Sequence, residues 1–118
     1  MLNKKKKNSL CKKNISFLTY IHKLPLSKRK KIITKFASKS EINSIIEIFL
    51  NFLNSKINCG KNIIKSLSKN KTYFNQIINK KKSIAFKRKK LSSKKGGFIL
   101  QTLLTLALPV IKNFFLNN

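Results

Sequence analysis

The sequence predicts an all-α protein: a small helical bundle with a disordered basic N-terminal arm and a C-terminal apolar helix after a Gly-Gly hinge. Apolar residues recur at steps of three and four over several segments, which is typical of helices that bury one face. No segment sustains the apolar–polar alternation of a strand. Because 42% of the 118 residues are apolar, we expect part of the chain to pack into a core.

Residues 1–12 are predicted to form the disordered basic arm. Lys4, Lys5, Lys6, Lys7 and Lys12 lie there with few apolar residues, and such a block of like charges is typically disordered. The small helical domain is predicted over residues 13–80.

Two helices are predicted at the start of this domain. The first is indicated by the apolar positions Ile15, Leu18, Tyr20, Ile21 and Leu24. It should end before Pro25, because a proline disfavours helical geometry in the residue before it. The second is predicted from Ser27 to Phe36, with Ser27 as its N-cap.

The longest apolar stripe follows and predicts the core helix of the bundle, over about residues 40–56. Ser38 and Glu41 have the spacing of a capping box, in which each side chain accepts a hydrogen bond from the other residue's backbone amide. The stripe consists of Ile42, Ile45, Ile46, Phe49, Phe52 and Leu53.

Two shorter amphipathic helices are predicted after a turn at Gly60. The first is indicated by Ile63, Ile64 and Leu67, and the second by Tyr73, Phe74, Ile77 and Ile78. No alternating pattern interrupts them, which keeps the prediction all-α.

Residues 81–97 are predicted to be a basic nucleic-acid-binding segment that ends in Gly-Gly. This stretch, with Lys80 before it, has the densest positive charge in the chain. Dense blocks of like charge are usually interaction segments, and the alternative is a solvated helix face.

Residues 98–118 are predicted to form the apolar C-terminal helix. Gly96 and Gly97 should break the preceding helix and act as a hinge, or as a processing site together with Phe98. Residues 98–111 carry no charge, but a membrane-spanning helix needs about 20 apolar residues. We therefore expect a helix that lies at a membrane interface or is buried against protein.

The charge balance predicts a polyanionic partner. The chain has 28 Lys and Arg against 2 Asp and Glu, a formal net charge of +26, which favours association with nucleic acid or an anionic membrane. Arg29 and Arg88 are the only arginines, so few side chains could read guanine through a bidentate contact. The predicted partner is double-stranded DNA, bound through phosphates without sequence preference by Lys4, Lys5, Lys6, Lys7, Lys28, Arg29, Lys30, Lys31, Lys80, Lys81, Lys82, Lys87, Arg88, Lys89, Lys90, Lys94 and Lys95.

No catalytic or metal-binding constellation is apparent, so we expect no enzyme, metal or cofactor. His22 is the only histidine and has no acidic residue near it in sequence. Glu41 and Glu47 lie on the predicted core helix, and Cys11 and Cys59 leave a zinc site short of ligands. The absence of a signal-peptide pattern predicts an intracellular protein.

The junction of residues 94–104, with a basic run before it and Pro109 after it, resembles the C-terminal half of the adenovirus late core protein X (mu) family. A looser similarity covers about residues 20–111. It links His22-x-Leu24, residues 47–53 and the run from Lys81 to Leu91 to the small protein that carries the same tail in adintoviruses and Maverick/Polinton elements.

The resemblance implies a minor core protein that condenses a viral genome inside the capsid, located in the virion core and the host nucleus. The chain departs from that family in using lysine rather than arginine. Lys94 stands where the family's protease site has an apolar residue, so cleavage between Gly97 and Phe98 stays open.

The alternative is a membrane-active cationic protein, in which residues 98–116 insert into an anionic bilayer and the preceding lysines stay at the headgroups. In the DNA-condensing interpretation, the same tail would contact the capsid interior or other copies of the chain. A ribosome-associated basic protein is a third option, which the apolar tail disfavours.

Overall fold

The computed structural model describes residues 8–53, 65 and 69–116, and it is helical with no strand in those residues. The predicted all-α class is therefore confirmed. The elements in chain order are a π-helical turn η1 (Asn8–Lys12), α2 (Ile15–Lys23), α3 (Leu26–Lys31), a second π-helical turn η2 (Ile32–Phe36), α4 (Lys39–Leu53), α6 (Lys71–Ile78), α7 (Ile84–Ser92) and α8 (Lys94–Leu116).

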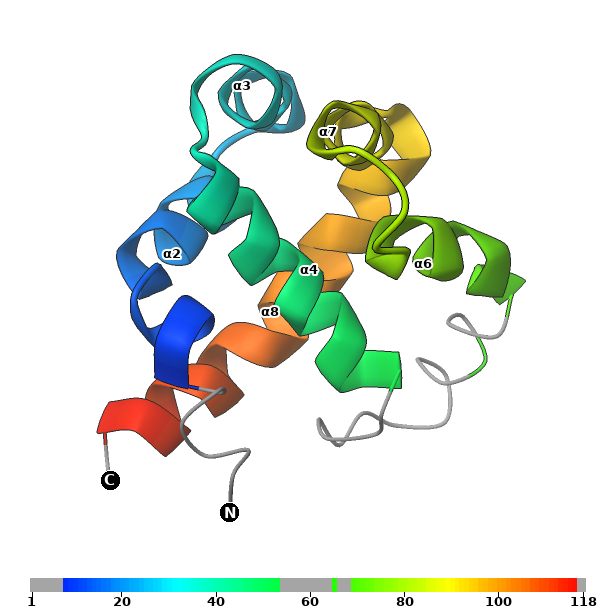
Figure 1. The fold of residues 1–118 in the computed structure, drawn as a ribbon. Helices are drawn as coiled ribbons and strands as arrows, with labels where there is room; N and C mark the ends of the chain where they lie inside the picture. The colour runs from blue at the N-terminus through cyan, green and yellow to red at the C-terminus, as the bar shows by residue number, and fades with distance from the viewer. Residues whose placement is uncertain (1–7, 54–64, 66–68, 117–118) are drawn as a thin grey trace.

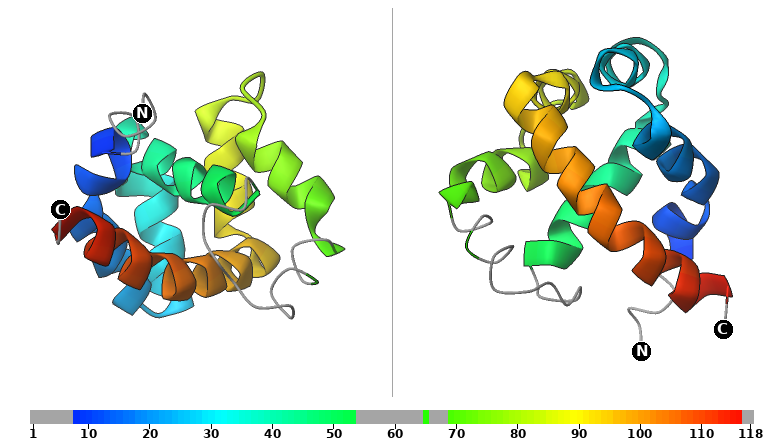
Figure 2. Two further views of the ribbon diagram at one scale, coloured as in Figure 1. Left: turned by 90° about the horizontal axis from the view of Figure 1, so that it is seen from below. Right: turned by 180° about the vertical axis from the view of Figure 1, so that it is seen from behind.

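Helices α4 and α8 cross in the middle of the molecule, and the other helices pack around this crossing (Figures 1 and 2). Helices α3 and α7 lie beside each other at one end. Phe49 of α4 and Phe74 of α6 are completely buried, with their ring centroids 4.9 Å apart and the rings tilted by 53°. This is a favourable arrangement for an aromatic pair and anchors α6 to α4.

Two helix boundaries follow the local signals. Helix α2 ends at Lys23, and Leu24 before Pro25 is extended, as predicted. The capping box before α4 is also confirmed: the Ser38 amide donates to Glu41 Oε1 at 2.8 Å, and the Glu41 amide donates to Ser38 Oγ at 3.1 Å.

The predicted N-cap at Ser27 is wrong. Helix α3 begins at Leu26, and Pro25 occupies the cap position with φ −60° and ψ 156°. The Pro25 carbonyl accepts the first helical hydrogen bond, from the Arg29 amide at 3.0 Å. A proline needs no hydrogen-bond partner for its nitrogen, so it can precede the first turn without cost.

The prediction of a disordered arm is wrong for residues 8–12, which form η1 against α4. Cys11 is buried, and its amide donates to Glu47 Oε1 at 3.0 Å. Its thiol also contacts the Ser44 carbonyl. The arm lysines 4–7, the predicted turn at Gly60 and the apolar positions 63, 64 and 67 lie outside the described residues.

The glycine pair is not a hinge between helices, since α8 begins at Lys94 and continues through both glycines. The break lies three residues before Gly96, at Ser93, whose backbone is extended with ψ 163°. Ser93 Oγ accepts a hydrogen bond from the Gly96 amide at 3.0 Å, and the Ser93 carbonyl accepts one from Gly97 at 2.7 Å. This serine satisfies amides that the first turn of a helix leaves free, so the helix can begin before the glycines.

Gly96 has a packing role instead. A Cβ atom at this position would clash with the Lys90 carbonyl and come within 2.5 Å of Tyr73 Oη. At Gly97 the nearest atom to an added Cβ is the end of the Leu26 side chain, at 3.0 Å. Glycine at position 96 therefore lets α8 approach α6 and the end of α7 closely.

The predicted boundaries near residues 80 and 97 do not separate packing units in the described structure. Leu91 of α7 belongs to the same core cluster as Phe49. The buried face of α8 joins that cluster and consists of Leu100, Leu103, Leu104, Ala107, Leu108 and Ile111. The predicted C-terminal tail therefore completes the core.

Candidate nucleic-acid interface

Helices α3 and α7 bring together two cationic runs that are far apart in sequence, at residues 28–31 and 87–90. Arg88 Nη1 donates to the Ile33 carbonyl at 2.9 Å and so links α7 to η2, the turn that follows α3. The start of α8 packs against α7, and its Gly97 carbonyl accepts a hydrogen bond from Arg29 of α3. We call this region the α3–α7 end; its lysines are Lys28, Lys30, Lys31, Lys89, Lys90, Lys94 and Lys95.

All of these lysines are exposed except Lys90, which is half-buried. Lys80, Lys81 and Lys82 are also exposed, on the connection that leads into α7. Two of the cations flank an aromatic ring: Lys82 Nζ lies 4.9 Å and Lys90 Nζ 5.5 Å from the Phe86 ring centroid. These cation–π contacts hold lysines without neutralising them.

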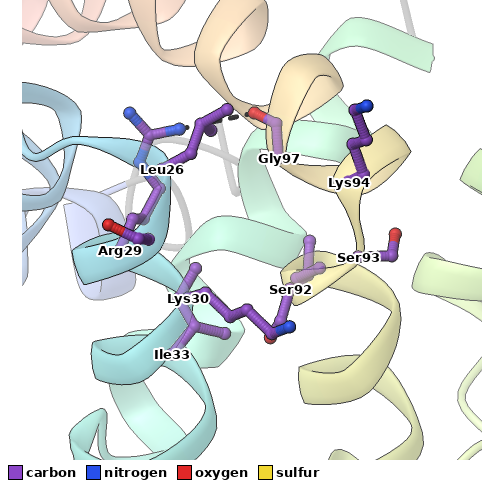
Figure 3. A pocket seen from close by; sticks show the side chains of 10 residues that line it. Leu26, Arg29, Lys30, Ile33, Ser92, Ser93, Lys94 and Gly97 are labelled. Carbon is purple, nitrogen blue, oxygen red and sulfur yellow. Dashed lines mark hydrogen bonds between the residues drawn. The ribbon is translucent and has the colours of Figure 1, made fainter.

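A cleft of about 220 Å³ lies at the α3–α7 end. Figure 3 shows its lining coming from α3 on one side and from the junction of α7 and α8 on the other. Leu26, Ile33 and Leu91 form an apolar part of the lining, while Lys30 and Lys94 bring positive charge from opposite sides. The cleft is thus a hollow with cations on both of its walls.

Arg29, a predicted DNA-binding residue, is instead an internal structural residue, only 3% exposed. Its guanidinium donates to the carbonyls of Ile21 at 2.9 Å, Leu24 at 3.1 Å and Gly97 at 3.3 Å, and to Gln101 Oε1. Burial lowers its pKa from the ordinary value. Four of its N–H groups are engaged, and the carbonyls of Ile21 and Leu24 belong to the end of α2, where helices leave carbonyls free.

Lys87 and Arg88, which were also predicted to bind DNA, are buried and half-buried. The Lys87 side chain is 6% exposed, and burial lowers its pKa. Arg88 is half-buried and donates to a backbone carbonyl, as described above. Both arginines of the chain therefore donate hydrogen bonds to backbone carbonyls, and the fully exposed cations of the α3–α7 end are lysines.

Both glutamates are engaged with backbone amides. Glu41 accepts from Ser38 in the capping box, and Glu47 accepts from Cys11. Burial raises the pKa of Glu47, and its hydrogen bonds with Cys11 oppose that shift. Within the described part of the chain, neither carboxylate forms an ion pair with lysine or arginine.

A second basic hollow involves lysines that the sequence analysis did not predict to bind DNA. Lys12 of η1, Lys23 of α2 and Lys112 of α8 line a groove of about 550 Å³, together with Tyr20. Lys23 and Lys112 lie outside the dense basic runs, and Lys12 is the last residue of the basic N-terminal segment. Only the fold brings them together, so no sequence signal for this groove exists beyond the overall charge.

His22 lies between two groove residues in sequence, Tyr20 and Lys23, and connects α2 to α8. Its Nε2 lies 3.0 Å from Thr105 Oγ1, within hydrogen-bond distance. The pKa of His22 is lowered, first by burial and then by the positive charges of Arg29, Lys112 and Lys23.

The described residues contain no group of three His, Cys, Asp or Glu side chains that could hold a metal ion. The Cys11 thiol is buried, and burial together with the neighbouring Glu47 raises its pKa. A thiol in this state is a poor nucleophile, because the thiolate is the reactive form. Cys59 lies outside the described residues.

One stretch, Lys94–Asn113, is long and apolar enough to cross a membrane by length and composition. Core helices of water-soluble proteins pass the same criterion, and α8 packs one face into the core, as described above. Its exposed apolar side chains include Phe98 at 57% and Val110 at 44%. The outer face therefore offers only part of the helix to a bilayer or a protein partner.

No family model, curated protein or solved structure matches this chain. The likeness to the adenovirus core protein family therefore stays a prediction that rests on the residues around the glycine pair.

Proposed function

We propose that this protein binds double-stranded DNA through its phosphates, without sequence preference, and condenses it. One observation carries the proposal: the fold places lysines from distant segments at the α3–α7 end, while both arginines are hydrogen-bonded to backbone carbonyls. Bidentate contact with guanine is chiefly made by arginine, whereas a lysine acts on phosphate as a point charge. The available chemistry therefore favours backbone binding over base readout.

The expected salt dependence follows from the number of lysines engaged. If about four lysines of the α3–α7 end contact phosphates, log K should fall with log salt at a slope of about −3.6. Raising the salt from about 50 to 200 mM would then weaken binding by roughly 150-fold.

The biological setting that we propose is the core of an adenovirus-like virion or of an integrated viral element, with the host nucleus as the place of assembly. This part rests on the resemblance of the Gly-Gly junction and its flanks. Genome packing is a role in which sequence-independent phosphate binding suffices, as in other proteins that bind DNA only by its backbone.

Membrane insertion of residues 98–116 has a structural cost. Leu100, Leu104 and Ala107 are completely buried in the core. A membrane-inserted α8 would expose these side chains to lipid, so the helix would first have to leave the bundle. DNA binding by the exposed lysines requires no such rearrangement. We therefore place DNA binding first and membrane binding second.

The test is a salt titration of binding to several duplexes of equal length and different sequence. We expect affinities within about threefold of one another. A preference above about tenfold, equivalent to roughly 1.4 kcal/mol, or an affinity that does not change with salt, would contradict the proposal.

Charge-matched variants locate the interface. Replacing Lys30, Lys89 and Lys94 by Gln should make the slope less steep by up to about 2.7, or 0.9 for each phosphate contact. The control replaces the exposed lysines Lys65, Lys69 and Lys71 by Gln, which removes the same charge away from the α3–α7 end. Equal effects of the two variants would mean that the α3–α7 end is not the interface.

A further inference from the structure

One side of α8 carries polar residues along most of its length. Lys94 and Lys112 are 18 positions apart in this continuous helix (Figure 2), which is five turns at about 3.6 residues per turn. Gln101 and Thr105 lie about two and three turns after Lys94. The four side chains therefore project from the same side of α8, which we call its polar side.

Hydrogen bonds identify the neighbours of the polar side. Gln101 Oε1 accepts a hydrogen bond from the Arg29 guanidinium of α3. Thr105 Oγ1 lies 3.0 Å from Nε2 of His22, which belongs to α2. Thr105 is exposed, and Gln101 and His22 are half-buried, so solvent reaches the boundary between the helices at these side chains. We call this boundary, formed by Gln101 and Thr105 with Arg29 and His22, the α8 seam.

The α8 seam runs between the two basic hollows. Lys94, at one end of the polar side, lines the cleft opposite Lys30. Lys112, at the other end, lines the groove with Lys12 and Lys23. Both glutamates of the chain lie on α4, and neither lines the cleft or the groove. Both ends of the seam thus favour an anionic ligand.

The length of the polar side decides how one ligand can use both ends. Lys94 and Lys112 are about 27 Å apart along the axis of α8, at a rise of about 1.5 Å per residue. Duplex DNA covers that distance with about eight base pairs, at about 3.4 Å per pair. Its persistence length is about 150 base pairs, so such a segment is a straight rod. A straight duplex therefore reaches from the cleft to the groove without bending.

We propose that one DNA duplex lies along the α8 seam and contacts the lysines of the cleft and of the groove at the same time. This inference rests on the proposed function and extends its interface from the α3–α7 end along α8. Ser16 and Tyr20, which also line the groove, are exposed, and such hydroxyls are common donors to phosphate oxygens. The binding site then covers about eight base pairs or more.

The experiment compares two DNA hairpins, with stems of about 12 and about 4 base pairs that are roughly 41 and 14 Å long. The long stem reaches both hollows, whereas the short stem reaches one. Replacing Lys12 and Lys23 by Gln should make the log–log salt slope of the long hairpin less steep by about 1.8, or about 0.9 for each phosphate contact. The short hairpin should keep its slope, because it binds at the α3–α7 end, where more lysines gather.

The matched control replaces Lys65 and Lys69 by Gln. Both residues are exposed, and neither lines the cleft or the groove. This variant removes the same charge and should leave both slopes unchanged. Because Lys12 and Lys23 are also exposed, circular dichroism of both variants should match that of the natural chain.

A single substitution tests the middle of the seam. Thr105→Glu places a negative charge beside the path of the duplex and should weaken binding of the long hairpin about fivefold at low salt. Val110→Glu adds the same charge farther along α8, about 140° around the helix axis from Thr105, at a side chain that is 44% exposed. It should weaken binding by less than about twofold.

The outcomes separate this inference from the proposed function. If the variant of Lys12 and Lys23 loses the same slope on both hairpins, or on neither, no single duplex joins the two hollows. The inference then fails, while salt-dependent binding still supports the proposed function. Equal effects of Thr105→Glu and Val110→Glu would show that the duplex does not follow the seam, which also overturns the inference. If the natural chain binds neither hairpin, the proposed function fails and the inference fails with it.

Discussion

Arg29 and Gly97 are 68 residues apart in sequence, and Arg29 Nη1 donates a hydrogen bond to the Gly97 carbonyl over 3.3 Å. The same guanidinium holds the end of α2 through the Ile21 and Leu24 carbonyls. One arginine thus joins α2, α3 and the first turns of α8. A cationic residue that the sequence analysis predicted to bind DNA is therefore buried and holds helices together.

Replacing Arg29 by Ala should destabilise the protein by roughly 3 kcal/mol, because it removes four hydrogen bonds that join α2, α3 and α8. Replacing the exposed neighbour Lys28 by Ala should change stability by no more than about 0.5 kcal/mol. Urea unfolding followed by circular dichroism measures both values. A harmless Arg29→Ala substitution would show that these hydrogen bonds do not hold the helices together.

The glycine pair should respond unequally to alanine. Gly96→Ala should destabilise by about 1–3 kcal/mol, since its Cβ meets a backbone carbonyl that cannot move freely. Gly97→Ala should be neutral or stabilising by up to about 1 kcal/mol, because alanine favours a helix and the nearby Leu26 side chain is partly exposed. Thermal unfolding of the two variants tests this. A hinge would instead make both substitutions stiffen the chain in the same way.

Deleting residues 98–118 should abolish cooperative unfolding, because it removes the buried face of α8 from the core. A milder test is Leu104→Ala, expected to cost about 2–5 kcal/mol because Leu104 is completely buried. Val110→Ala is the matched control on the exposed side and should cost much less. A truncated chain that still melts cooperatively would show that the tail is an independent contact or membrane element.

Stability should decrease when the pH falls from about 8 to 5.5, in part because of His22. Its pKa in the folded protein is lowered from 6.5, so the unfolded chain takes up the proton more readily. Folding stability from this group is therefore fully present above pH 6.5 and lost as the pH falls through the folded pKa. His22→Gln should flatten the dependence measured by urea unfolding.

Glu47 acts in the opposite direction, because its pKa is raised from 4.5 by burial. The folded protein holds that proton more tightly, so this group favours folding as the pH falls. The double variant with His22 and Glu47 both replaced by Gln separates the two contributions. An unchanged pH dependence in His22→Gln would mean that His22 is not shifted.

Much of the fold could be predicted from local sequence signals. The capping box of Ser38 and Glu41, the end of α2 before Pro25 and the apolar stripe of α4 all depend on residues within about four positions of one another. Such signals act within a single helix turn or a single helix face. For that reason the sequence predicts the all-α class and most helix positions without any tertiary contact.

The sites were decided by tertiary structure. Charge alone marked Arg29 and Lys87 as DNA ligands, and only the packing of α2, α3, α7 and α8 shows that both side chains are buried. Composition marked Gly96 as a hinge, and only the nearness of Lys90 and Tyr73 shows that it is a close-packing position.

Lys12, Lys23 and Lys112 are the third case, since nothing in their sequence neighbourhoods relates them to one another. By itself, the sequence determined that the chain is helical and strongly positive. Tertiary structure decided which cations face solvent and which of them share a surface. The reason is physical: helix formation depends on neighbours along the chain, whereas burial and juxtaposition depend on contacts between residues that the chain separates by tens of positions.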